Sequence, residues 1–182
     1  GILVAIRALF CLSLGISVIG FQVLSRDLPT LARIQSIEPS VKTVIFAANG
    51  DTLREFYTEN RTVVPLSRIP RRLQDAVIAV EDRRFYSHYG IDLRRLVGVI
   101  WINLTSSRSP GASTLTQQLA LNLFLKRERT LSRKAKEALL AIDIEKRYSK
   151  DQILTMYANQ VFFGHGAYGV EAASELYFDK PA

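Results

Sequence analysis

The sequence predicts a mainly α-helical domain that is preceded by an apolar segment and a small β-hairpin. Three observations lead to this prediction. Residues 1–24 are almost wholly apolar, two short β-prone runs flank the turn sequence Asn49-Gly50-Asp51, and apolar residues recur at helical spacing from Pro70 onward. We therefore divide the chain into residues 1–24, residues 25–60 and residues 61–182.

The composition is that of a basic protein with a large apolar share. Of its 182 residues 48% are hydrophobic, and the formal net charge is +7, which favours an anionic partner. One cysteine excludes a disulfide framework, and one cysteine with two histidines makes a structural zinc site unfavourable. The chain has no glycine-rich phosphate loop, and its basic residues do not alternate with aromatic ones. Nucleotide binding therefore has no support, and the support for nucleic-acid binding is weak.

Residues 1–24 predict a single uncleaved transmembrane helix. The apolar run from Ala8 to Leu24 is near the lower limit of ~17 residues for crossing a bilayer, and Arg7 can extend its charge to the interface. A cleaved signal peptide and a buried core helix are the alternatives, but no A-x-A-like site follows Leu24. Because the chain opens on Gly1 and not Met, we expect a piece of a longer protein.

For the rest of the chain the sequence predicts a linker followed by helices. Residues 44–46 and 53–57 are expected to pair as a hairpin within the linker. The first predicted helix ends near Glu81, and the second begins at Asp92. The apolar faces of both helices are expected to pack into the core. The expected helix starts are Pro70, Asp92, Ser113 or Thr114, Thr130, Ser149 and Val170. The expected core-facing residues of the first two helices are Leu73, Val77, Val80, Leu93, Leu96, Val97, Ile100 and Leu104.

Residues 81–92 hold the densest group of chemically active side chains. Glu81 falls at the end of a helix, on the edge of its apolar stripe, where a carboxylate is partly desolvated. Arginines and aromatic residues follow it, and a general base requires such a setting. The alternative is a charged helix end that runs into an aromatic loop.

Two further stretches could bind polar ligands. Residues 113–118 carry hydroxyls and amides at a helix start, which suits sugar hydroxyls or phosphate oxygens, although ordinary capping explains them as well. In the longest predicted helix, residues 130–148, Glu137 is surrounded by basic side chains; a solvated face of ion pairs is the alternative. His165 lies between two glycines without a nearby His or Cys, so we expect no metal site there.

Four stretches in fixed order resemble the motifs of the family 51 glycosyltransferases, the peptidoglycan polymerases found in class A penicillin-binding proteins and in monofunctional enzymes. The stretches are residues 81–92, 111–122, 133–138 and 153–178. The resemblance covers about residues 61–182 and implies a lysozyme-like helical domain. It implies an inverting enzyme that polymerises lipid II into β-1,4 glycan strands and releases undecaprenyl pyrophosphate.

The resemblance also implies roles for single residues. Glu81 matches the general base that takes the proton of the acceptor's 4-hydroxyl, and Glu137 matches a second carboxylate that orients the donor pyrophosphate or a divalent cation. No cofactor is implied as required, but Mg²⁺ or Mn²⁺ at the pyrophosphate is compatible with the motif. The implied substrate-binding residues are Asp82, Arg83, Phe85, His88, Ser113, Thr114, Gln117, Gln118, Asn122, Arg133 and Lys134.

The family resemblance further implies a cellular setting. We expect a single-pass protein of the bacterial cytoplasmic membrane with its catalytic domain on the periplasmic or extracellular side. Lipid II, the nascent glycan strand and a cell-wall synthesis complex are the expected partners. The hairpin region resembles the segment between anchor and catalytic domain in bifunctional enzymes, so we expect a transpeptidase domain in the parent protein, although these residues contain no Ser-x-x-Lys.

Three positions depart from the family pattern. Leu121 stands where a lysine is usual, Thr155 where a glutamate is usual, and Asp179 where a glycine is common. Leu121 and Thr155 favour one alternative, an anchored module that binds glycan or lipid II without turnover. A lytic, muramidase-like enzyme is the other alternative. The basic cluster around Glu137 argues against it, because a cutting enzyme has no pyrophosphate to neutralise.

Overall fold

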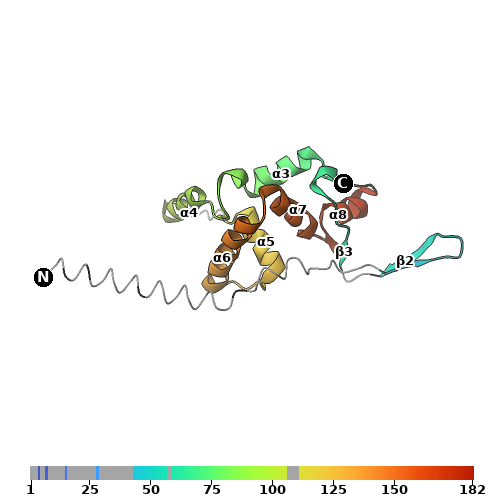
Figure 1. Ribbon diagram of the computed structural model, residues 1–182, viewed down its shortest axis with the longest axis horizontal. Helices are drawn as coiled ribbons and strands as arrows, with labels where there is room; N and C mark the ends of the chain where they lie inside the picture. The colour runs from blue at the N-terminus through green and yellow to red at the C-terminus, as the bar shows by residue number, and fades with distance from the viewer. Residues whose placement is uncertain are drawn as a thin grey trace.

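The computed structural model describes residues 43–56, 59–105 and 111–182, and the single positions Val4, Arg7, Gly15 and Leu28 (Figure 1). The predicted transmembrane helix over residues 1–24 otherwise lies outside these described residues. Within them, no helix combines the length and the apolar character that crossing a bilayer requires.

The described part of the chain is mainly helical, as the sequence predicts. The helices are α3 (Arg71–Glu81), α4 (Leu93–Thr105), α5 (Leu115–Phe124), α6 (Leu131–Arg147), α7 (Lys150–Gln160) and α8 (Val170–Phe178), with short 3-10 turns at Leu66–Arg68 and Phe85–Ser87. The strands are β1 (Thr43–Phe46), β2 (Thr52–Phe56), β3 (Asn60–Arg61), β4 (Phe162–Gly164) and β5 (Ala167–Tyr168).

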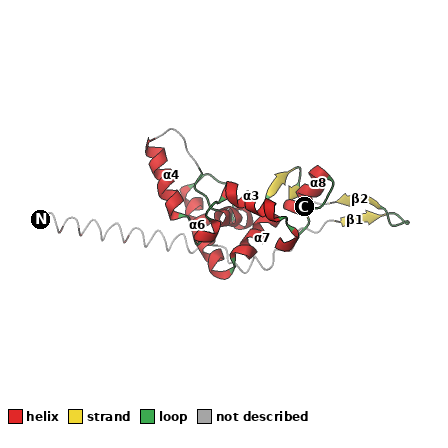
Figure 2. Ribbon diagram, turned by 90° about the horizontal axis from the view of Figure 1, so that it is seen from above, coloured by secondary structure: helices red, strands yellow, loops and turns green. Residues whose placement is uncertain are grey.

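The predicted hairpin is present. β1 and β2 pair antiparallel, with Thr43 opposite Phe56, and Figure 2 shows them projecting from the helical body. Gly50 has a φ of +90° in the connecting turn, a conformation that glycine adopts without steric penalty. The expected strand limits agree with the observed ones to within one residue.

Side-chain caps confirm the predicted helix starts at Asp92, Thr114, Thr130 and Ser149, whereas α3 begins at Arg71, one residue after the predicted Pro70, and α3 and α8 have no side-chain cap. Thr114, and not Ser113, caps α5, and its side chain and that of Gln117 form a capping box. Ser149 and Gln152 form the same motif at α7. The Asp92 carboxylate accepts a 3.0 Å hydrogen bond from the backbone N–H of Arg95 at the start of α4. These bonds satisfy amide groups that a helix start leaves free.

The core lies where α5, α6 and α7 meet. Leu115 and Leu119 of α5, Leu140 and Ile144 of α6, and Ile153 of α7 are at most 1% exposed. Val77 and Ile78 of α3 pack against this cluster from outside. The end of α3 is thereby fixed over the start of α5, which is where the candidate site lies.

The prediction that α4 packs its apolar face into the core is wrong. Leu93, Val97, Trp101 and Leu104 are between 66% and 78% exposed. Both views place α4 at the edge of the helical body (Figures 1 and 2). Val80, expected in the core stripe of α3, is likewise 76% exposed. Helical periodicity identifies an apolar face but not the element that covers it.

A small three-stranded sheet, which the sequence analysis missed, ties the segment before α3 to the C-terminal region. β3 pairs parallel with β5, and β4 pairs antiparallel with β5. Next to this sheet, the buried Asn159 side chain donates to the carbonyl of Val64 and accepts from its N–H, both at 2.9 Å. The amide side chain thus takes the place of a neighbouring strand.

Candidate active site

The predicted general base, Glu81, lies at the last residue of α3 and is held by a side chain from α5. Gln118 Nε2 donates a 2.7 Å hydrogen bond to Glu81 Oε2. The hydroxyl of Tyr157 lies 3.4 Å from Gln118 Oε1 and completes a chain of three side chains. Burial, and next the negative charge of Glu81, raise the pKa of Tyr157 to about 12. The tyrosine therefore stays protonated and acts as a donor.

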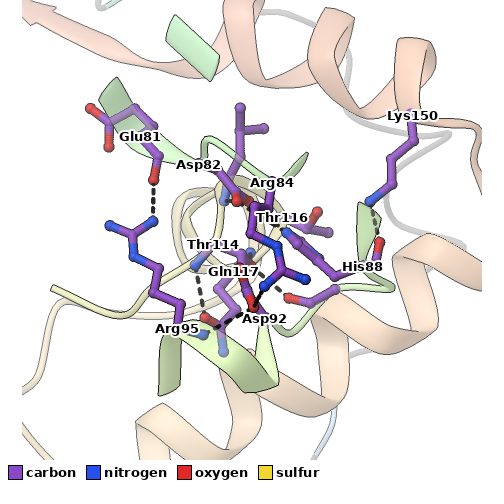
Figure 3. A network of polar contacts seen from close by, with 12 residues as sticks. Glu81, Asp82, Arg84, His88, Asp92, Arg95, Thr114, Thr116, Gln117 and Lys150 are labelled. Carbon is purple, nitrogen blue, oxygen red and sulfur yellow. Dashed lines mark hydrogen bonds and ion pairs between the residues drawn. The ribbon is translucent and has the colours of Figure 1, made fainter. Parts of the chain in front are cut away.

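The backbone at Glu81 is fixed from a third element. Arg95 of α4 donates from Nη1 to the Glu81 carbonyl at 2.7 Å and from Nε to the Gly111 carbonyl at 3.1 Å. Figure 3 shows the Glu81 carboxylate pointing away from this contact. The sequence analysis did not single out Arg95. Its only signal is a place three residues after the helix cap Asp92, which does not reveal the long-range contact.

Asp82 is a buried structural anchor. His88 Nε2 lies 3.0 and 3.1 Å from its two carboxylate oxygens, and the backbone N–H of Leu115 donates to it at 3.0 Å. Burial by itself raises the pKa of Asp82. The hydrogen bonds from His88 and Leu115 and the positive charge of Arg95 outweigh burial and lower the pKa below its usual 3.8. The ionised carboxylate joins the end of α3 to the start of α5.

Several residues expected to bind substrate are buried in the same support. The Thr114 hydroxyl donates to the Gly90 carbonyl at 2.6 Å, and Gln117 is used by the capping box. Phe85 is 0% exposed in the core. The buried positions are Asp82, Phe85, His88, Thr114 and Gln117. In this conformation these side chains support the site, and their contact with substrate stays a prediction.

A second buried group beneath the site was not anticipated. Lys150 donates to the His88 carbonyl at 2.7 Å (Figure 3). It also donates to Glu145 at 2.7 Å, and its Nζ lies 4.4 Å from the centre of the Phe85 ring. Thr116 donates to the same Glu145 oxygen at 2.6 Å. The loop that follows Glu81 is thus held from α7 as well as from α5.

The second predicted carboxylate, Glu137, lies beneath a pair of cations on α6. Lys134 Nζ donates to Glu137 Oε2 at 2.7 Å and to Ser113 Oγ at 2.6 Å. Arg133 pairs with the other oxygen of Glu137. The side chain of Glu137 is 2% exposed, that of Arg133 20% and that of Lys134 43%, so Lys134 is the most exposed of the three. Burial, and next the charge of Arg133, lower the pKa of Lys134 below its usual 10.5.

Asn122 and Leu121 line a separate, mostly polar pocket of about 340 Å³ at the end of α5. Arg61 and Arg127 also line it. The structure therefore places two arginines around Leu121, the position where a lysine was expected. Asn122 lies one helical turn beyond Gln118 on α5.

The arrangement can therefore remove a proton at one place and stabilise an anion at another. Glu81 is a partly exposed carboxylate whose position is fixed by Gln118. Arg133 and Lys134 present positive charge that Glu137 holds in place. Among the described residues no group of three His, Cys, Asp or Glu side chains could hold a metal ion.

Comparison with known proteins shows the family to which this chain is similar. The family model described as transglycosylase matches residues 49–182. The chain is 49% identical over 133 residues to penicillin-binding protein 1F of Bacillus subtilis, covering 72% of this chain and 19% of that protein. It is 41% identical over 178 residues to penicillin-binding protein 1A of Escherichia coli, covering 96% of this chain and 21% of the other.

A third relative has a comparable sequence identity. Penicillin-binding protein 1A of Aquifex aeolicus is 44% identical over 156 residues, which cover 85% of this chain and 22% of that protein. The chain thus spans about a fifth of the length of the curated relatives it matches. On the strength of the family match and these identities, the chain belongs to the transglycosylase family, the family 51 glycosyltransferases whose motifs its sequence resembles.

Proposed function

We propose that the protein is a peptidoglycan glycosyltransferase that polymerises lipid II into β-1,4 glycan strands and releases undecaprenyl pyrophosphate. Family membership supports this proposal. The observation that carries it is the combination of a fixed, partly exposed carboxylate at Glu81 with the Arg133–Lys134 cation pair held by Glu137. A transfer from a pyrophosphate donor requires both a base and a cationic site.

In the proposed reaction Glu81 takes the proton of the acceptor's 4-hydroxyl. Its Oε2 accepts from Gln118, and Oε1 has no hydrogen-bond partner within the described part of the chain, which leaves it available for the proton. The acceptor oxygen forms a bond to the donor's anomeric carbon on the face opposite the pyrophosphate. The bond from that carbon to the pyrophosphate oxygen breaks, its electron pair leaves with the pyrophosphate, and the configuration inverts.

The leaving group needs positive charge rather than a proton. Arg133 and Lys134 provide charge-assisted donors for the pyrophosphate as its negative charge increases. A glycosidase, in contrast, needs a carboxylic acid to protonate its leaving oxygen. Mg²⁺ or Mn²⁺ at the pyrophosphate stays compatible with the site, because such an ion is usually held by one or two carboxylates together with substrate phosphates. We assign neutralisation of the leaving group to the two cations.

We also propose the membrane setting that the substrate demands. A lipid-linked substrate and an enzyme on one membrane surface meet in two dimensions, which raises their effective concentration. The exposed apolar face of α4 supports contact with that surface. The finer proposals are a single-pass helix in residues 1–24, a catalytic domain outside the bacterial cytoplasmic membrane, a bifunctional penicillin-binding parent and work within a cell-wall synthesis complex.

The test is polymerisation of purified lipid II in detergent by the full-length protein. A general base contributes about 10²–10⁴-fold, so Glu81→Gln is expected to lose at least about 100-fold in rate. Glu175→Gln, which removes an exposed carboxylate on α8, is the matched control and should retain the wild-type rate.

Other outcomes would contradict specific parts of the proposal. Equal polymer from wild type and Glu81→Gln would remove Glu81 from the role of base. Binding of lipid II without polymer from the wild type would favour the binding module, and shortening of added glycan would favour a lytic enzyme.

A further inference from the structure

Arg95 of α4 binds the backbone of two separate segments next to the proposed base, and the proposed reaction gives it no role. Its Nη1 donates to the Glu81 carbonyl at 2.7 Å, and its Nε donates to the Gly111 carbonyl at 3.1 Å. Figure 3 shows the first of these bonds, with the Glu81 carboxylate pointing away from it. Arg95 therefore contacts the backbone of the proposed base and not its reacting atoms.

The first bond fixes the end of α3. Glu81 is the last residue of this helix, and a helix end leaves its last carbonyls without partners inside the helix. The N–H of the capping residue, Asp82, closes the last turn by donating to the Ile78 carbonyl. The Glu81 carbonyl is met by Arg95 instead, which also places positive charge at the negative end of the helix dipole. The backbone that carries the Glu81 carboxylate is thereby held in place.

The second bond joins the same guanidinium to the segment that leads into α5. Gly111 precedes this helix, and Gln118 of α5 donates to Glu81 Oε2 at 2.7 Å. One side chain thus connects both supports of the base, namely its own backbone and the entry to the helix that holds its carboxylate. Because Nε and Nη1 lie in one rigid plane, both carbonyls are bound together only over a narrow range of relative positions.

We propose that Arg95 is a positioning residue that sets where the Glu81 carboxylate lies relative to the acceptor's 4-hydroxyl. This inference rests on the proposed function. A base must lie about 2.6–3.2 Å from the atom whose proton it takes, and a displacement of about 1 Å can cost about 10²-fold in rate. Arg95 is half-buried, so water can replace its bonds when the side chain is removed. Its loss should therefore loosen the base without unfolding the domain.

The test is a double-mutant cycle between Arg95→Ala and Glu81→Gln in the full-length protein, with kcat and KM for lipid II polymerisation as readouts. Arg95→Ala keeps the backbone N–H that Asp92 caps and removes only the two guanidinium bonds. We expect it to lower kcat about 10–100-fold while KM changes by less than about threefold. In the Glu81→Gln background it should change the residual rate by less than about threefold, because no base is left to misplace.

Two further variants separate bond geometry from charge and from nonspecific effects. Arg95→Lys keeps the positive charge, but its single nitrogen cannot reproduce the planar fork, so its kcat should also fall. Arg72→Ala removes an exposed arginine at the opposite end of α3 and is the matched control, which should keep the wild-type kcat and KM. Hydrogen–deuterium exchange in Arg95→Ala should rise at residues 82–85 and stay unchanged in α6 and α7.

Three results would overturn the proposal. They are an unchanged kcat in Arg95→Ala, an equal loss of rate in the wild-type and Glu81→Gln backgrounds, and a wild-type kcat in Arg95→Lys. The second would show a general effect on the fold, and the third would show that only charge matters.

Polymer formation by the wild type tests the proposed function separately. If no polymer forms, the proposed function is removed, and the exchange at residues 82–85 still decides the role of Arg95. Faster exchange there would support Arg95 as the residue that positions Glu81, and unchanged exchange would overturn it.

Discussion

Replacing Asp82 by asparagine tests whether this residue supports the fold or contacts the substrate. The carboxylate is fully buried and accepts from His88 and from the Leu115 N–H. Both donors reach Oδ2, so an asparagine oxygen there accepts from both without a charge, while its NH2 group replaces Oδ1 and leaves a donor facing His88 Nε2. Hydrogen bonds to a charged group contribute about 1.5–3 kcal/mol, and a buried unpaired donor costs about 1–3 kcal/mol. We expect the local free energy of unfolding to fall by about 3 kcal/mol.

The assay is hydrogen–deuterium exchange in the full-length protein. A loss of about 3 kcal/mol corresponds to about 150-fold faster exchange of the amides of α5 that open by unfolding. Asp75→Asn is the matched control on α3, because the Asp75 side chain is 58% exposed and pairs with Arg71 at the surface. Such a pair contributes about 0–1 kcal/mol. If Asp82→Asn lost polymerisation while its exchange stayed unchanged, the supporting role would be refuted and direct contact of Asp82 with the substrate would be favoured.

The stability difference between wild type and Asp82→Asn should change with pH in a defined direction. The folded-state pKa of Asp82 lies below its usual 3.8. Its stabilising contribution is therefore complete above about pH 3.8 and is lost as the pH falls through the folded-state pKa. The difference in exchange between wild type and Asp82→Asn should stay constant from neutral pH to that point and close only in stronger acid. Closure near neutral pH would contradict the assignment of an ionised, hydrogen-bonded carboxylate.

Three further predictions concern other features of the site. Gly90→Ala should lower the melting temperature more than Gly50→Ala does, because both glycines have positive φ but a Cβ at position 90 would lie 2.8 Å from α6 backbone whereas position 50 is open; equal shifts would refute close packing as the cause. Tyr157→Phe should lower kcat about threefold and leave KM unchanged, because only the 3.4 Å contact that positions Gln118 is lost; a change in KM alone would refute a positioning role. Lys134→Arg should extend polymerising activity to higher pH, since the lowered pKa of Lys134 removes its charge at a pH below 10.5 whereas arginine keeps it; identical alkaline limits of kcat/KM would show that this cation does not set them.

The sequence was sufficient to predict most helix boundaries because their signals are local. Capping residues such as Ser149 act on amides only three residues away, and the hairpin depends on one turn at Gly50. The hydroxyl and amide residues before α5 left two candidate caps, and the structure resolves them in favour of Thr114. Local capping and turn signals were therefore sufficient to predict the fold class.

The remaining features depend on contacts between distant segments. Gln117 and Gln118 are identical neighbours, yet one closes a capping box and the other holds Glu81, because successive helical side chains point about 100° apart. β3 has two residues, too few for an alternating pattern. Arg95 contacts Glu81 across the fold. Only a three-dimensional arrangement distinguishes such residues from ordinary surface groups.

The pairing of Asn159 with Val64 has a mechanical consequence. Tension applied through the residues before Asn60 would act first on the short β3–β5 ladder and then on the two hydrogen bonds between Val64 and Asn159, because β3 and Val64 precede α3 in the chain. These bonds would bear the load before the helix that ends in Glu81 is strained. In a single-molecule pulling experiment, Asn159→Ala should therefore let force reach α3 at a lower extension, while the hairpin itself yields as before.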